Sequence, residues 1–197
     1  MNKFQAMKGK VIVDVLEEEN QTSSGLHIVR KSNKNPLRGH VMSVGRDRIA
    51  PKRTFKAPCK IGDVVHYKKG TSFQINSQFE KRKMSVIYFG DIVGVQRGED
   101  LLASYDNVVV QVFYKDTSDT IIIPEVLQKR MASFVGNVTS VGPEYNERWD
   151  PTLNRGDIIL FPRDEGFPIV IGDEAYYSLY PEHIKGKINQ EDVGGLI

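Results

Sequence analysis

The sequence has one cysteine in 197 residues, Cys59, and no long hydrophobic run. A single cysteine excludes an internal disulfide and any cysteine-rich zinc site. The apolar runs are only a few residues long, too short for a transmembrane helix, and the amino-terminal residues contain no apolar stretch of signal-peptide length. We therefore expect a cytoplasmic protein that does not contact a membrane.

Signatures of enzyme chemistry are also missing. The histidines, His27, His40, His66 and His183, have no spacing typical of a metal site, and there is no phosphate-binding loop of the G-x-x-x-x-G-K type. Cys59 lacks the local signature of a catalytic nucleophile. We therefore expect no enzyme activity, no metal and no cofactor, and we expect that the chain itself does not bind ATP.

What the sequence does contain is one pattern written twice. Residues 11–16 (VIVDVL) return as 108–113 (VVVQVF), residues 39–45 (GHVMSVG) as 136–142 (GNVTSVG), and residues 62–67 (GDVVHY) as 156–161 (GDIILF). Three blocks in the same order, with nearly constant offsets, indicate a duplicated domain rather than a solenoid repeat. We place the two domains at residues 1–98 and 99–197, called the first and second repeat below.

The charges of the two repeats are opposite. Residues 1–98 carry 19 Lys and Arg against 8 Asp and Glu, whereas residues 99–197 carry 8 against 17. Opposite net charges favour electrostatic attraction between the repeats, within one chain or between chains. The alternative is that each charged face is simply solvated. Binding of nucleic acid is not expected, because the cations are scattered and no aromatic–basic signature accompanies them.

Short strand patterns dominate both repeats, and helical periodicity is nearly absent. Runs rich in β-branched and aromatic residues, bounded by Gly, Pro or charged clusters, predict strands at residues 11–16, 40–44, 63–67, 84–88, 107–113, 137–141, 157–161, 168–171 and 175–179. Their length and spacing predict an all-β fold of barrel or sandwich type. Asp63 and Asp157 follow glycine in both repeats, which indicates turn residues rather than catalytic carboxylates.

The order of these elements carries a family resemblance. In the first repeat, a strand is followed by an acidic linker, an apolar tripeptide after Ser24 and Gly25, a G-x-V-x-x-V-G strand at 39–45, a Gly-Asp strand at 62–67 and a closing strand at 90–95. The second repeat has the same order and closes at 182–188. This order resembles the GroES-type co-chaperonins, in their tandem double-domain form.

The resemblance implies two tandem GroES-like small β-barrels with long mobile loops. It also implies that edge strands of neighbouring barrels pair with each other, so that several chains form a homo-oligomeric ring. It implies a GroEL-type chaperonin as partner and an unfolded client protein that the ring encloses indirectly. The loop residues that would bind the chaperonin are Leu26, His27, Ile28, Ile121, Ile122 and Ile123.

Two of these assignments have alternatives. The first tripeptide is also compatible with an edge strand and the second with a buried strand. His27 departs from the aliphatic residue usual in the family, and no glycine precedes Ile121. The expected source is bacterial or viral, with the cytoplasm of a bacterium or of a virus-infected host as the site of action. The alternative function is a GroES-like fold co-opted as a viral structural or assembly protein without chaperonin binding.

Overall fold

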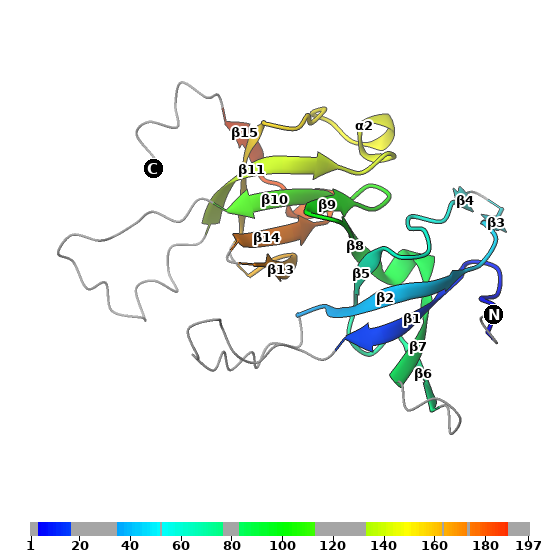
Figure 1. The fold of residues 1–197 in the computed structure, drawn as a ribbon. Coiled ribbons are helices and arrows are strands. Elements are labelled where there is room, and N and C mark those ends of the chain that lie inside the picture. The colour runs from blue at the N-terminus through cyan, green and yellow to red at the C-terminus, as the bar shows by residue number, and fades with distance from the viewer. Residues whose placement is uncertain are drawn as a thin grey trace.

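The computed structural model describes residues 4–16, 35–51, 53–76, 83–112, 133–162, 164–172 and 174–188. Two antiparallel sheets form most of the molecule (Figure 1). The first contains, in spatial order, β6 (Phe73–Asn76), β7 (Lys83–Tyr88), β1 (Lys10–Leu16), β2 (Leu37–Val44), β5 (Val64–Tyr67), β8 (Ile92–Arg97) and β9 (Asp100–Ala103). The second contains β13 (Phe167–Ile171), β14 (Glu174–Leu179), β10 (Val108–Val112), β11 (Ser133–Val141), β12 (Ile158–Pro162) and β15 (Gly186–Ile188). The all-β expectation is confirmed.

The duplication extends to the register of the hydrogen-bond ladders. The spatial order β7-β1-β2-β5-β8 of the first sheet is matched by β14-β10-β11-β12-β15 in the second. The β1–β2 ladder shifts register between Ile12 and Val13, and the β10–β11 ladder shifts between Val109 and Val110. A bulge at the same place in both ladders shows that the repeats are two copies of one structural unit.

Each repeat has its own core, built from the inward-facing side chains of alternating strand residues. The first core centres on Val11, Val13, Val41, Val65, Tyr67 and Ile87. The second centres on Val108, Val110, Val138, Ile159 and Phe161. Burial of each such side chain contributes about 1.5–3 kcal/mol, so the recurring sequence blocks are the residues that stabilise the two units.

The last glycine of each G-x-V-x-x-V-G strand is required by a close backbone approach. A Cβ atom on Gly45 would lie 1.9 Å from the carbonyl oxygen of Met7, and one on Gly142 would lie 2.1 Å from that of Tyr105. Contacts this short exclude any side chain. The motif glycines therefore allow the chain that enters each repeat to cross the end of the strand.

The Gly-Asp pairs form turns, as the sequence predicts. Gly62 and Gly156 have φ angles of +93° and +95°, which only glycine adopts readily. The Asp63 carboxylate accepts a hydrogen bond from the backbone N–H three residues earlier at 2.9 Å, and Asp157 does the same at 2.8 Å. Both carboxylates therefore have a structural role in the turn.

The repeats differ before their Gly-Asp strands. The first repeat has a two-stranded hairpin there, formed by β3 (Arg48–Ala50) and β4 (Arg53–Phe55). The second has the short helix α2 (Tyr145–Arg148) at the same position. The 3₁₀ turns η1 (Phe89–Asp91) and η2 (Pro181–His183), by contrast, lead into equivalent closing strands.

Candidate functional site

The six residues predicted to bind a chaperonin lie outside the described residues. Leu26, His27 and Ile28 belong to the segment 17–34, and Ile121, Ile122 and Ile123 belong to the segment 113–132. The structure does define the strand ends from which these segments leave and to which they return.

Those strand ends are equivalent in the two repeats. Val15 near the end of β1 pairs with Gly39 of β2, and Val112 at the end of β10 pairs with Gly136 of β11. Val15 packs against the first core, and Val112 is buried in the second. Both strand pairs end on the same side of the molecule, at the left in Figure 1. Both predicted loops therefore leave from anchored, equivalent positions.

The two repeats are joined by a β-ladder. β9 belongs by sequence to the second repeat, since Leu101 and Ala103 stand at an offset of 97 from Phe4 and Ala6. It nevertheless pairs with β8 of the first repeat, with Ala103 opposite Gly94. The first strand of the second repeat therefore completes the sheet of the first, and we call this ladder and the contacts around it the internal joint.

An apolar cluster lies under the internal joint. It consists of Val93, Leu101, Val109 and Ile169, and we call it the joint cluster. Val93 is 0% exposed, and its carbonyl oxygen accepts a hydrogen bond of 2.5 Å from the Ser178 hydroxyl. A Cβ atom on the neighbouring Gly94 would lie 3.1 Å from Ile169 and 3.2 Å from Leu101. The side chains of the second repeat therefore pack directly on the backbone of β8.

Polar contacts hold the hairpin of the first repeat against the second. The Arg53 guanidinium lies 2.6 Å from the Glu144 carboxylate. It also stacks over the rings of Phe55 and Tyr105, at 4.8 Å and 5.1 Å from their centroids. The Tyr105 hydroxyl donates a hydrogen bond to the carbonyl of Lys56 at 3.0 Å. The basic and acidic repeats thus attract each other at this point within the chain.

Two segments resemble the two sides of the internal joint: residues 4–6 resemble β9, and β15 resembles β8. Ala103 of β9 donates its backbone N–H to Ser140 Oγ at 2.9 Å, and Ala6 donates its own to Ser43 Oγ at 3.0 Å. Residues 4–6 therefore occupy the place of β9 in the first repeat, although they are assigned to no strand.

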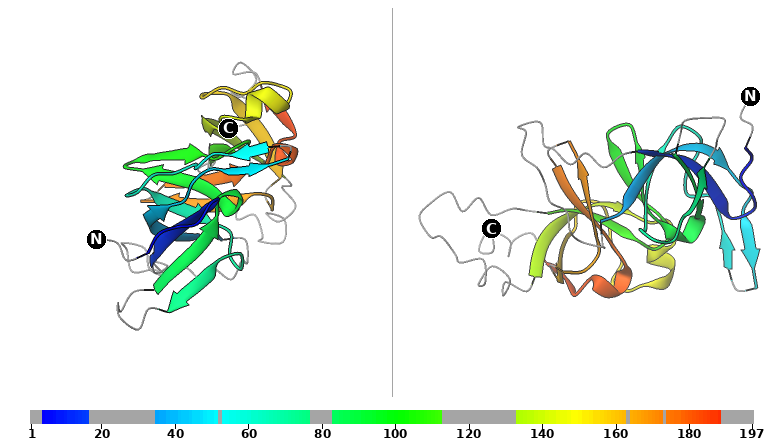
Figure 2. Two further views of the ribbon diagram at one scale, coloured as in Figure 1. Left: turned by 90° about the vertical axis from the view of Figure 1, so that its right-hand side faces the viewer. Right: turned by 90° about the horizontal axis from the view of Figure 1, so that it is seen from below.

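The matching edge belongs to β15, the last strand of the second sheet in the described part of the chain. Gly186 pairs with Leu160 as Gly94 pairs with His66, and a Cβ atom on Gly186 would meet no heavy atom within 4 Å. β15 and the amino-terminal residues lie at opposite ends of the molecule (Figures 1 and 2). One chain therefore does not bring these two segments together.

Two buried titratable groups, Asp63 and Cys59, have shifted pKa values that are explained by their roles in the fold. Burial opposes ionisation of Asp63, but hydrogen bonds of 3.0 Å and 2.8 Å from Arg97 hold the pKa of that carboxyl below its usual range. Burial raises the pKa of the Cys59 thiol to about 12, so the thiol is not activated.

The described residues also contain no metal site and no membrane span. Among them, no group of three or more His, Cys, Asp or Glu side chains is placed to hold a metal ion. No helix in this part of the chain is long and apolar enough to cross a membrane.

Sequence patterns did not identify the joint residues as a group. Val93 and Ile169 have the character of ordinary core residues, so burial between repeats cannot be separated from burial within one. A usable signal was present in the pairs Ala6/Ala103 and Ser43/Ser140, which keep the offset of 97.

Comparison with known proteins agrees with this geometry. The family model described as "Chaperonin 10 Kd subunit" (Cpn10) matches twice, over residues 3–96 and 101–188. "Co-chaperonin GroES" of Thioalkalivibrio sulfidiphilus is 33% identical over 98 residues, which cover 48% of this chain and 98% of the relative. The protein of the same name from Lacticaseibacillus zeae is 30% identical over 87 residues, covering 44% and 91%. That from Legionella pneumophila strain Corby is 28% identical over 94 residues, covering 47% and 96%. The chain therefore belongs to the Cpn10 family of co-chaperonins and carries two copies of the family domain in tandem.

Proposed function

We propose that this protein caps a GroEL-type chaperonin and assists the folding of an enclosed client. The observation that carries the proposal is the duplicated Cpn10 unit, with a predicted apolar loop tip at the equivalent position of each copy. The contacts would be made by Leu26, His27 and Ile28 in the first repeat and by Ile121, Ile122 and Ile123 in the second. Because the relatives are bacterial, we propose the bacterial cytoplasm as the site of action.

The proposed contact is weak for one loop and strong for several. Burial of one large aliphatic side chain contributes about 1.5–3 kcal/mol, whereas ordering one loop residue costs about 1–2 kcal/mol of backbone entropy. One tripeptide therefore leaves little net affinity. Loops presented together on one assembly bind through effective concentration, and they release when the partner changes its conformation.

A homo-oligomeric ring would supply that multiplicity. The internal joint supports it, because the chain carries both halves of the same joint at opposite ends. In such a ring, β15 of one chain would pair with residues 4–6 of the next, in the register of β8 and β9. This arrangement is heterologous, and it closes only if the rotation between successive units completes a circle.

Nucleotide-dependent capture tests the proposal. An immobilised GroEL-type chaperonin should retain the wild-type protein in ATP or ADP and release it without nucleotide. Ile28→Asp and Ile122→Asp should each weaken retention, because each places a carboxylate at an apolar contact. The matched control is Ile49→Asp, since Ile49 lies on the β3–β4 hairpin and is already 71% exposed.

The outcomes separate the two functions under consideration. Retention that is lost in both loop variants and kept in the control supports the co-chaperonin. Retention that no loop variant weakens contradicts the loop assignment. A wild-type protein that is never retained, under conditions where bacterial GroES is, contradicts chaperonin binding and favours a structural or assembly role.

A further inference from the structure

Residues 4–6 and β15 match β9 and β8 of the internal joint in backbone register but not in their side chains. The register of β12 with β15 and of β5 with β8 makes Gly186 equivalent to Gly94. Lys185 is therefore equivalent to Val93. Directly before β15, the sequence thus presents an ammonium group at the position where β8 inserts a fully buried valine.

The receiving surface on the first repeat is apolar. Its core consists of Ala6, Ile12 and Met84, with Phe4, Ile75 and Val86 packed against them, and we call it the outer cluster. By ladder register and by the offset of 97, Phe4, Ile12 and Ile75 correspond to Leu101, Val109 and Ile169 of the joint cluster.

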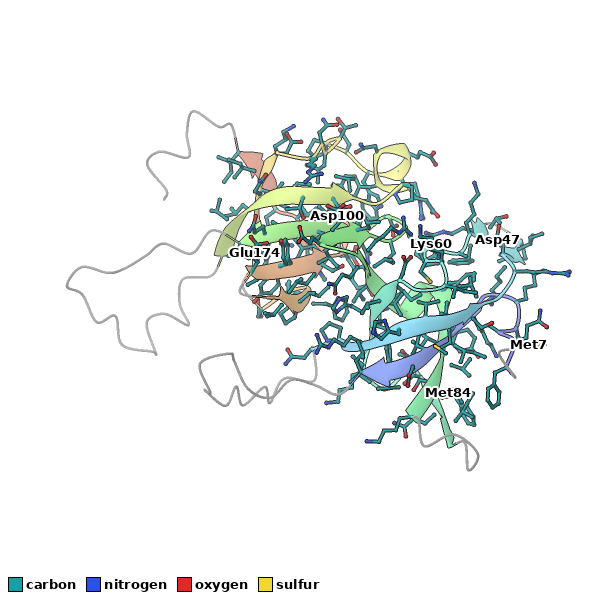
Figure 3. All side chains as sticks on the ribbon, in the orientation of Figure 1. Met7, Asp47, Lys60, Met84, Asp100 and Glu174 are labelled. Atoms are coloured by element: carbon teal, nitrogen blue, oxygen red, sulfur yellow. The ribbon has the colours of Figure 1, made fainter. Side chains whose placement is uncertain are left out.

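The outer cluster lies away from the second repeat. Figure 3 shows Met84 at the far side of the first repeat from the second sheet, where Glu174 is labelled. Phe73 beside it is 74% exposed, whereas its equivalent Phe167 packs against the joint cluster. The outer cluster is therefore the counterpart of the joint cluster: Ala6, Ile12 and Met84 are buried within the single chain, and Phe73 lies exposed beside them.

A second difference concerns a hydrogen bond. Ser178 donates to the carbonyl of Val93 in the internal joint. Val86 stands at the position equivalent to Ser178, since Phe73 pairs with Val86 as Phe167 pairs with Ser178. A joint between two chains therefore gains no such hydrogen bond. It brings Lys185, whose ammonium group donates to the carbonyl of Glu182 at 3.1 Å in the single chain, to the position of Val93.

We propose that the joint between chains is a weaker version of the internal joint, and that Lys185 is the residue that makes it weaker. The occupant of the outer cluster is β15 of a second copy of this chain, so the inference rests on the ring of the proposed function. A lysine must bend its ammonium group out to water to avoid desolvation, and lysine on an edge strand opposes uncontrolled pairing. Chains would then exchange or separate as intact two-repeat units, while the internal joint stays closed.

Restoration of the internal-joint residues tests the inference. Wild type, Lys185→Val and the double variant Lys185→Val with Val86→Ser are followed by sedimentation velocity over a dilution series. The control Lys187→Val removes the same charge two residues further along the chain, but Lys187 pairs with Asp157 within its own repeat at 2.8 Å. The expected result is a dissociation constant at least about tenfold lower for Lys185→Val and lower again for the double variant.

Each outcome decides the matter. A tighter association in Lys185→Val that the control does not reproduce supports the inference. An unchanged dissociation constant, or an equal change in the control, overturns it. Failure of wild type and variants alike to associate removes the joint between chains and also overturns it. The capture assay on the same preparations decides the proposed function separately.

Discussion

A buried histidine should make the first repeat more sensitive to acid than the second. His66 on β5 is 4% exposed, and its Nε2 atom has no hydrogen-bond partner. Burial, opposed by a hydrogen bond with Gln96 and aided by the charge of Arg38, lowers its pKa from 6.5 to about 4. Leu160 stands at the equivalent position of the second repeat. The second repeat thus has no titratable side chain at this buried position.

The magnitude follows from the shift of the His66 pKa. Above pH 6.5 the histidine is neutral in both states and does not affect the free energy of unfolding. As the pH falls, the unfolded chain takes up the proton first, so stability decreases by about 1.4 kcal/mol per pH unit. The decrease ends near pH 4, where the folded histidine also becomes protonated. The total loss for the first repeat is about 3 kcal/mol.

Unfolding of the two repeats can be followed separately. Trp149 is the single tryptophan and reports on the second repeat, while hydrogen exchange of residues 64–67 reports on the first. Between pH 7 and about pH 4.5, the first repeat should lose at least about 2 kcal/mol relative to the second. His66→Leu should abolish this difference, and the exposed His40→Leu should not. An acid loss that persists in His66→Leu would refute the reasoning.

Three further substitutions test the structural account. Asp63→Asn leaves Arg97 without its carboxylate, and urea unfolding should show a first repeat destabilised by about 1–3 kcal/mol; unchanged stability would show that the pair contributes nothing. Gly142→Val places a side chain against the carbonyl of Tyr105, and Trp149 fluorescence should show a second repeat destabilised by about 3 kcal/mol, in contrast to a tolerated change if the approach were loose. Gly186→Glu enters open space, so thermal unfolding of the single chain should be unchanged while sedimentation shows that chains no longer associate; association at the wild-type level would contradict the joint between chains.

Much of the fold could be predicted because the sequence signals were local. The runs VIVDVL and VVVQVF consist mostly of β-branched residues, and such runs form buried strands in most contexts. The Gly-Asp turns were equally predictable, since glycine and aspartate have conformational preferences that do not depend on distant residues. These are the elements that form β1, β10 and the turns before β5 and β12.

What could not be predicted depends on tertiary partners. Leu101 and Leu102 are compatible with a strand of either repeat, and only the ladder with β8 assigns them to the first sheet. The segments around Arg48 and Tyr145 stand at the same place in the two repeats, yet one forms a hairpin and the other a helix. Short segments of mixed propensity are decided by packing, which a local pattern does not contain.

The candidate binding site remains a prediction from the sequence. Ile28 and Ile122 lie in segments for which the structure supplies only the flanking strands. The structure adds that both segments leave from equivalent and anchored strand ends. A binding role was predictable because an apolar tripeptide stands within a duplicated pattern, and its affinity was not, because it depends on how many loops one assembly presents.

Assisted refolding measures co-chaperonin function directly. A denatured, chaperonin-dependent client enzyme is diluted into a GroEL-type chaperonin with ATP, and this protein replaces GroES. The account predicts that the recovered enzyme activity rises well above that with chaperonin and ATP alone. It also predicts that the double variant Ile28→Asp with Ile122→Asp loses this increase. A wild-type yield no higher than that of chaperonin and ATP alone would contradict the account.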